Sequence, residues 1–143
     1  CFIRGRGQLV AVDYVPSPEQ CSGEYPLLLI TGRVLQHYNV GSMTRRTPNS
    51  ELVSADLLEL NAHDAQNAGI RSGDRVRVRS RYGAIEVEAL VSQRVTPGML
   101  FLPFHFPESQ TNVLTGPYLD SQSKCPEYKL TAVRIGAAAE PSK

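Results

Sequence analysis

Potential ligand-binding side chains are concentrated in one short stretch of the sequence. The apolar run at residues 26–31, PLLLIT, changes at residue 32 into a segment with no period of 2 or 3.6. Gly32 and Gly41 would allow a ligand to come close to the backbone there. The set of donors suits a polyphosphate or a polar heterocycle, and the alternative is a polar loop that satisfies only its own backbone. The side chains of this segment that can donate hydrogen bonds include Arg33, His37, Asn39, Ser42, Thr44, Arg45 and Arg46.

Motifs of the common reaction centres do not occur in the sequence. There is no GxSxG nucleophile elbow, no HExxH pair, no GxGxxG turn and no P-loop. The three histidines are too widely spaced for a sequential metal motif, and Cys1, Cys21 and Cys125 form no CxxC pair. We therefore expect neither a zinc knuckle nor an iron–sulfur cluster within this chain, and we interpret the three cysteines as buried or idle thiols.

Composition narrows the possible function classes. With 143 residues, of which 41% are hydrophobic, the chain suits one globular domain. Its formal net charge of +1 gives no basic surplus for nucleic acid. No apolar run approaches the ~20 residues that a membrane-spanning helix needs. The sequence begins with Cys1 and shows no signal peptide, so we expect it to be a piece of a longer polypeptide.

Strands must position the donor-rich segment. Two long polar segments, 32–50 and 105–128, each follow an apolar run, and loops of that length in a compact domain usually carry function. Together with a hairpin near residue 82, the apolar runs give about six strands and few short helices, which predicts a mainly β domain. The runs outside the hairpin that predict strands are 26–31, 57–60, 99–104 and 129–135.

Helix signals surround the sequence NAHDAQNAG. Asn61 is a good N-cap, and the charge of Asp64 suits the first turn of a helix. Gly69 is expected to end the helix in a left-handed conformation. Ala65 and Ala68 would provide a small-residue face that can lie close to a sheet.

The predicted hairpin is supported by the agreement of its two faces. A two-residue turn at Tyr82-Gly83 would place Val78 opposite Val87, with an apolar face on one side and opposite charges on the other. We expect weak surface ion pairs on the charged face, because a nucleic-acid face would need interleaved aromatic residues. The arginines that alternate on this face are Arg75, Arg77, Arg79 and Arg81.

Several motifs in a fixed order resemble one known family. They are LLLITGRVLQHYNVGSMTRR, then NAHDAQNAGIRSGDRVRVRSRYGAIEVEALVSQRVTPGMLFLPFHFPES, then TNVLTG, and finally CPEYKLTAVRI. Over residues 25–135 this order is similar to the C-terminal molybdopterin-dinucleotide-binding domain of molybdenum and tungsten oxidoreductases. Within that family, HYNVGSMTRR, FHFPES and KCPEYK most resemble formate dehydrogenase alpha subunits, whereas TGR and SMTRR are shared with nitrate reductases.

The resemblance implies a double-psi β-barrel that holds one molybdopterin guanine dinucleotide. We expect an extended N-terminal arm or linker at 1–24, the barrel at 25–136 and a frayed tail at 137–143. By resemblance, His37 lies near the pyrophosphate or the pterin, and Asn112 binds the pterin. The residues that the resemblance assigns to cofactor binding are Thr31, Gly32, Arg33, His37, Ser42, Met43, Thr44, Arg45, His105, Asn112, Tyr128 and Lys129.

The same resemblance places the chemistry outside this chain. The parent enzyme would convert formate to carbon dioxide at molybdenum or tungsten, with catalytic residues and clusters in upstream domains of the same polypeptide. We therefore expect no catalytic residue and no metal ligand here, and no activity from the chain alone, which could also lack the cofactor when isolated. Iron–sulfur electron-transfer subunits are the expected further partners, and we expect neither nucleic-acid binding nor membrane insertion. The expected compartment is the cytoplasm, with the periplasm as the alternative. The competing hypotheses are the equivalent nitrate reductase domain and a non-enzymatic recruiting barrel.

Overall fold

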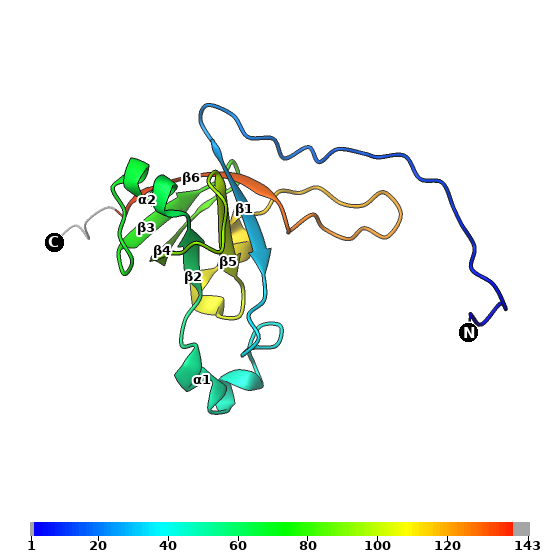
Figure 1. The fold of residues 1–143 in the computed structure, drawn as a ribbon, viewed down its shortest axis with the longest axis horizontal. Helices are drawn as coiled ribbons and strands as arrows, with labels where there is room; N and C mark the ends of the chain where they lie inside the picture. Colours follow the sequence, from blue (N-terminus) through cyan, green and yellow to red (C-terminus); the bar gives the residue numbers. More distant parts are fainter. Residues whose placement is uncertain (1, 139–143) are drawn as a thin grey trace.

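Six strands close into a barrel in the computed structural model, which describes residues 2–138 (Figure 1). Around the barrel the strands follow the order β1-β5-β2-β4-β3-β6. The strands are β1 (Leu27–Gly32), β2 (Leu57–Leu60), β3 (Arg75–Arg79), β4 (Ala84–Val91), β5 (Met99–Pro103) and β6 (Thr131–Ala137). The helices are α1 (Asn49–Leu52), α2 (Ala62–Ala68) and three 3-10 turns, Thr44–Arg46, Pro107–Ser109 and Thr111–Leu114. The predicted fold class, a mainly β double-psi barrel with short helices, is confirmed.

Pairing between strands that are far apart in the sequence determines where the loops emerge. Strands β1 and β5 run parallel, as do β2 and β4, while the other four pairings are antiparallel. At the end of the β1–β5 pair, Gly32 lies beside Pro103. Because these parallel strands end together, the two long polar loops leave the barrel at the same end. No sequence period reports this pairing.

The core follows the alternation of side chains along each strand. Val76 and Val78 of β3 are fully buried, and the buried residues Val87 and Ile85 of β4 are their partners in the sheet. The long leucines of β1, β2 and β5 complete the interior, and each is fully buried: Leu29, Leu58, Leu60, Leu100 and Leu102. Burial of such a side chain stabilises the fold by roughly 1.5–3 kcal/mol.

The β3–β4 hairpin has the predicted faces but not the predicted register. Val78 pairs with Ile85 and Val76 with Val87, so each residue lies opposite a partner two positions away from the expected one. A shift of two residues keeps every side chain on its own face. The valines therefore point inward, and the arginines of β3 lie outside, with Arg77 paired to Glu86 as an exposed pair.

The turn of this hairpin explains the shift. Ser80 Oγ accepts hydrogen bonds from the N–H groups of Tyr82 and Gly83, at 3.0 and 3.2 Å, and the Ser80 N–H donates to the Gly83 carbonyl at 2.9 Å. The turn residues are therefore Arg81 and Tyr82 rather than Tyr82 and Gly83. A Cβ at Gly83 would lie 2.5 Å from Val113 Cγ1, so this glycine permits close packing instead of forming the turn.

Helix α2 ends where the sequence predicts. Asn61 Oδ1 accepts from the His63 N–H at 3.0 Å, and Gly69 adopts φ 67°. Ala65 is buried, but Ala68 is exposed, because the helix contacts the barrel with one face only. Asp64 is buried and accepts from the Gly98 N–H at 2.7 Å, which connects the helix to the turn before β5.

The remaining differences from prediction are small shifts of boundaries. Strand β5 ends at Pro103, and β6 begins at Thr131 and extends to Ala137. The predicted tail 137–143 lies, from residue 139 onward, outside the described residues. The arm at residues 2–24 is extended, and Figure 1 shows it leading away from the barrel before β1. Within residues 2–138, no helix is long and apolar enough to cross a membrane.

Candidate functional site

The two polar loops enclose a groove at the end of the barrel where β1 and β5 stop. One loop follows Gly32, and the other follows Pro103. The groove has a volume of about 400 Å³, which is at the small end of ligand pockets. Its lining residues are Arg33, Asn39, Val40, Phe104, Asn112, Thr115, Pro126 and Tyr128. Three of the predicted residues, Arg33, Asn112 and Tyr128, therefore share one surface.

Arg33 is held at the groove by a short polar contact. Its Nη2 donates to Asn39 Oδ1 at 2.9 Å, and its guanidinium carbon lies 5.5 Å from the centroid of the Phe104 ring. Asn39 adopts the left-handed conformation with φ 46°, which asparagine tolerates better than most residues. The contact with Asn39 uses one of the five guanidinium N–H groups, and the side chain remains exposed. Arg33 can therefore bind an anion without first rearranging.

An aromatic floor lies between two cations. The Phe104 ring has Arg33 on its face and the Lys129 ammonium 5.8 Å from its centroid. The Tyr128 ring meets Phe104 edge-on at 6.4 Å. Lys129 Nζ also donates to the Thr31 carbonyl at 3.4 Å, so a loop residue near β6 is attached to the end of β1. The sequence did not indicate Phe104 as a site residue, because it is the last residue of the apolar run 99–104, which predicts a strand.

His37 and His105 are buried and do not line the groove. Both side chains are buried, at 4% and 0% exposure. His37 Nε2 donates to the Val53 carbonyl at 2.8 Å, and its Nδ1 accepts from Thr44 Oγ1 at 3.0 Å. His105 Nε2 accepts from the Val34 N–H at 3.0 Å, which leaves Nδ1 to donate to the Asn39 carbonyl. These bonds engage both nitrogens of each ring.

The two histidines instead join the loops that form the groove. Their ring centroids are 5.6 Å apart, and each ring bonds to backbone of the loop after β1 or of the segment before β2. His37 therefore does not line the groove that contains Asn112, and its expected place near the pyrophosphate or the pterin stays a prediction. Residues 39 and 40 of the same loop reach the groove instead. Buried imidazoles with fixed tautomers give the loops a defined shape.

Asp56 is a further support that the sequence did not reveal. Its buried carboxylate accepts from the N–H groups of His105 and Phe106, at 3.2 and 3.0 Å, and from Ser109 Oγ at 2.7 Å. These bonds attach the start of the second loop to the segment before β2. In the sequence, Asp56 stands before an ordinary strand, and no local pattern distinguishes it from a solvated turn residue.

The predicted residues Ser42, Met43, Thr44 and Arg45 do not line the groove. Arg45 Nη2 pairs with Glu108 Oε1 at 2.8 Å, and its guanidinium lies 4.7 Å from the Phe106 centroid. The hydrogen bond from Arg45 lowers the pKa of Glu108 below its usual value. Arg45 lines a separate hollow of about 340 Å³. Ser42 and Met43 are exposed and line neither this hollow nor the groove.

The remaining predicted residues act at the base of the groove. Thr31 is buried, and its Oγ1 donates to the Tyr128 carbonyl, which fixes the position of the tyrosine. A Cβ at Gly32 would lie 2.4 Å from the Phe101 ring. The absence of a side chain at Gly32 is therefore required by packing against β5, in addition to any approach of a ligand. Thr115 Oγ1 donates to the Asn112 carbonyl at 2.8 Å and stabilises the second wall.

The residues that line the groove are suited to binding a ligand through stacking, hydrogen bonds and charge. A planar polar ring can stack on Phe104 or Tyr128, and an anionic group can bind Arg33. Asn112 offers both a donor and an acceptor to such a ring. Among residues 2–138, no group of three His, Cys, Asp or Glu side chains is arranged to hold a metal ion. The site therefore has the character of a nucleotide-binding surface.

The fold and this surface belong to a known class of cofactor-binding domain. Residues 27–132 match the model of the Molydopterin dinucleotide binding domain. Because this match covers most of the chain, the chain belongs to that family, as the motifs of the sequence predicted.

Similar proteins agree with this family. The chain is 42% identical over 132 residues to the F420-dependent formate dehydrogenase subunit alpha of Methanocaldococcus jannaschii. These residues are 92% of the chain and 20% of that protein. For the F420-dependent formate dehydrogenase 1 subunit alpha of Methanococcus maripaludis the identity is 37%, with the same coverage. The periplasmic nitrate reductase of Desulfovibrio desulfuricans is 38% identical over 123 residues, which are 84% of the chain and 16% of that protein.

The fold also occurs within a solved structure. Acetylene hydratase from Pelobacter acetylenicus matches with a TM-score of 0.67 and 17% identity, over 80% of this chain and 19% of that one. At this identity the likeness concerns the fold alone. The chain spans about a fifth of the length of the formate dehydrogenase subunits that it matches.

Proposed function

We propose that this chain is the cofactor-binding domain of a molybdenum- or tungsten-dependent formate dehydrogenase and that it binds one molybdopterin guanine dinucleotide. The observation that carries this proposal is the groove in which Arg33, Asn112 and Tyr128 converge around Phe104. Sequence identities of 37% and 42% to two formate dehydrogenase alpha subunits, each over 92% of the chain, support the choice of enzyme.

The residues of the groove fit this cofactor by their chemistry. The guanidinium of Arg33 is suited to a phosphate oxygen, and Asn112 can pair with the edge of a pterin or a guanine. The faces of Phe104 and Tyr128 suit a stacked heterocycle. A volume of about 400 Å³ accommodates only part of a dinucleotide. We therefore propose that other domains of the same polypeptide cover the remainder.

The bound cofactor would supply the redox-active metal, and this chain would bind and orient it. In the parent reaction formate would give carbon dioxide, one proton and two electrons, and the electrons would leave through iron–sulfur subunits. Because this chain contributes recognition only, it has no activity alone. The upstream domains are the first partners that we propose, and the cytoplasm is the proposed compartment, with the periplasm as the alternative.

Three measurements on the protein at its native length test this function. Metal analysis should find molybdenum or tungsten, and nucleotide released by mild acid should contain guanine. Reduction of a dye acceptor should depend on formate. A protein that holds metal and guanine but reduces nitrate and does not oxidise formate would instead support the nitrate reductase equivalent, which the 38% identical relative favours. A protein with neither metal nor guanine would indicate a recruiting barrel and would overturn the proposal.

A further inference from the structure

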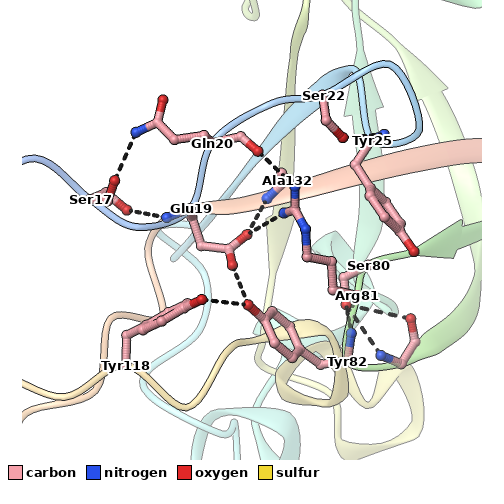
Figure 2. Close-up of polar contacts among 11 residues, drawn as sticks. Ser17, Glu19, Gln20, Ser22, Tyr25, Ser80, Arg81, Tyr82, Tyr118 and Ala132 are labelled. Carbon is pink, nitrogen blue, oxygen red and sulfur yellow. Dashed lines mark hydrogen bonds and ion pairs between the residues drawn. The ribbon is translucent and has the colours of Figure 1, made fainter.

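Glu19 is buried although it belongs to the extended arm. Its side chain is 1% exposed. The carboxylate accepts from the backbone N–H of Ala132 in β6 at 2.9 Å and from the hydroxyl of Tyr82, and it lies 3.5 Å from Arg81 Nη1 (Figure 2). A buried carboxylate requires this degree of pairing. The arm is therefore attached to the barrel at one defined point.

The hairpin turn provides most of this attachment. Arg81 Nη2 donates to the Gln20 carbonyl at 3.0 Å, and its guanidinium lies 5.0 Å from the centroid of the Tyr25 ring. Figure 2 shows the arm, the turn and β6 meeting at Glu19. Arg81 and Tyr82, the two residues of the hairpin turn, are thus the ones that bind Glu19 and Gln20 of the arm.

A hydroxyl pair continues from the turn to the second groove loop. The hydroxyls of Tyr82 and Tyr118 are 3.2 Å apart. Because Tyr82 gives its single proton to Glu19, Tyr118 is the donor within this pair. Burial, together with the Glu19 carboxylate, raises the pKa of Tyr82 above its usual value, so Tyr82 remains a donor. A Cβ at Gly116 would lie 2.9 Å from both tyrosine rings, which shows how closely the loop follows them.

The turn also packs against the segment that carries two groove residues. A Cβ at Gly83 would lie 2.5 Å from Val113 Cγ1 and 2.7 Å from the Val113 carbonyl oxygen. Val113 is next to Asn112, and Gly116 is next to Thr115, and both Asn112 and Thr115 line the groove. The contacts of the turn are therefore one residue away from the groove wall.

The arm also lies beside the second groove loop. A cavity of about 470 Å³ lies between residues 15–18 of the arm and residues 118–127 of the loop. Pro126 lines this cavity as well as the groove. Tyr118, which bonds to Tyr82, also lines this cavity.

We infer that Glu19 is a positioning residue for the groove, which acts through Tyr82 and Tyr118 on the loop that carries Asn112 and Thr115. This inference rests on the proposed function, because the groove is the site at which the cofactor would bind. Glu19 lies outside the matched residues 27–132. A segment before the barrel thereby contributes to the shape of the nucleotide-binding surface.

Amide hydrogen exchange and cofactor retention test this role in the protein at its native length. The N–H groups of Val113 and Thr115 are bonded to carbonyls at 2.9 and 3.2 Å, so their exchange reports order in the loop. In Glu19→Ala we expect their exchange to become at least tenfold faster, and we expect loss of guanine nucleotide during gel filtration to be about tenfold faster. Glu19→Gln keeps one carbonyl acceptor and should restore most of the protection.

Three further variants keep the test decisive. Glu24→Ala removes an exposed carboxylate from the same arm and should change neither readout. Val78→Ala weakens the core without removing a side chain that contacts Glu19 and controls for general destabilisation. If Glu19→Ala does not fold, Tyr82→Phe removes only the hydroxyl and should shift both readouts in the same direction.

The outcomes separate this inference from the proposed function. Unchanged exchange at residues 112–118 in Glu19→Ala, or nucleotide loss no faster than in Val78→Ala, would overturn the positioning role. A wild-type protein without nucleotide would overturn the proposed function, and the exchange measurement would then decide by itself whether Glu19 orders the loop.

Discussion

Replacement of Arg33 by alanine tests the groove most directly. Arg33 is exposed, and its polar contact among residues 2–138 is one hydrogen bond to Asn39. Its loss should therefore change the free energy of unfolding by no more than about 0.5 kcal/mol. A charge-assisted hydrogen bond to a ligand contributes about 1.5–3 kcal/mol, and each 1.4 kcal/mol is tenfold in affinity. We expect cofactor to bind about 10- to 150-fold more weakly.

The assay follows metal and guanine content during dilution of the protein at its native length, together with its thermal unfolding. Arg134→Ala removes an exposed arginine from β6 and serves as the matched control. Arg33→Lys keeps the charge but loses the planar fork, so it should retain part of the affinity. If Arg33→Ala keeps full cofactor content at every dilution while Arg134→Ala behaves identically, Arg33 is not a ligand and the reasoning from the groove is refuted.

Three further predictions concern the supports of the groove. Asp56→Ala leaves the buried N–H groups of His105 and Phe106 without an acceptor, whereas Ser109 Oγ keeps the Phe106 carbonyl, so urea unfolding should show a loss of about 3–5 kcal/mol, and a loss below about 1 kcal/mol would contradict the role of this carboxylate. Gly83→Ala places a Cβ 2.5 Å from Val113, so we expect about 1–3 kcal/mol of destabilisation by overpacking, and an unchanged melting temperature would contradict it. Burial and Glu19 raise the pKa of Tyr82 above its unfolded value of about 10. The stability that this shift contributes is present below pH 10 and is lost as the pH rises above it. The melting temperature should fall more steeply above pH 10 in the wild type than in Tyr82→Phe, and parallel curves would show that Tyr82 does not contribute to this loss.

Local signals in the sequence predicted the elements well. Asn61 and Gly69 mark the ends of α2, because capping depends on residues within one turn of each other. The alternation of valine and arginine in β3 determined which face is buried. The register of the hairpin was not determined in this way, because a shift of two residues leaves both faces unchanged and the Ser80 side chain selects the turn.

The assembly of the site depended on contacts between distant residues. The sequence by itself determined the barrel strands, the two donor-bearing loops and, through the order of its motifs, the family. Only the tertiary structure decided that β1 lies beside β5, that His37 and His105 turn inward, and that Glu19 reaches the turn of the hairpin. Hydrogen bonds such as that between Glu19 and Ala132 join residues more than a hundred positions apart. No local period or propensity reports such a contact, because its energy exists only after the chain has closed around it.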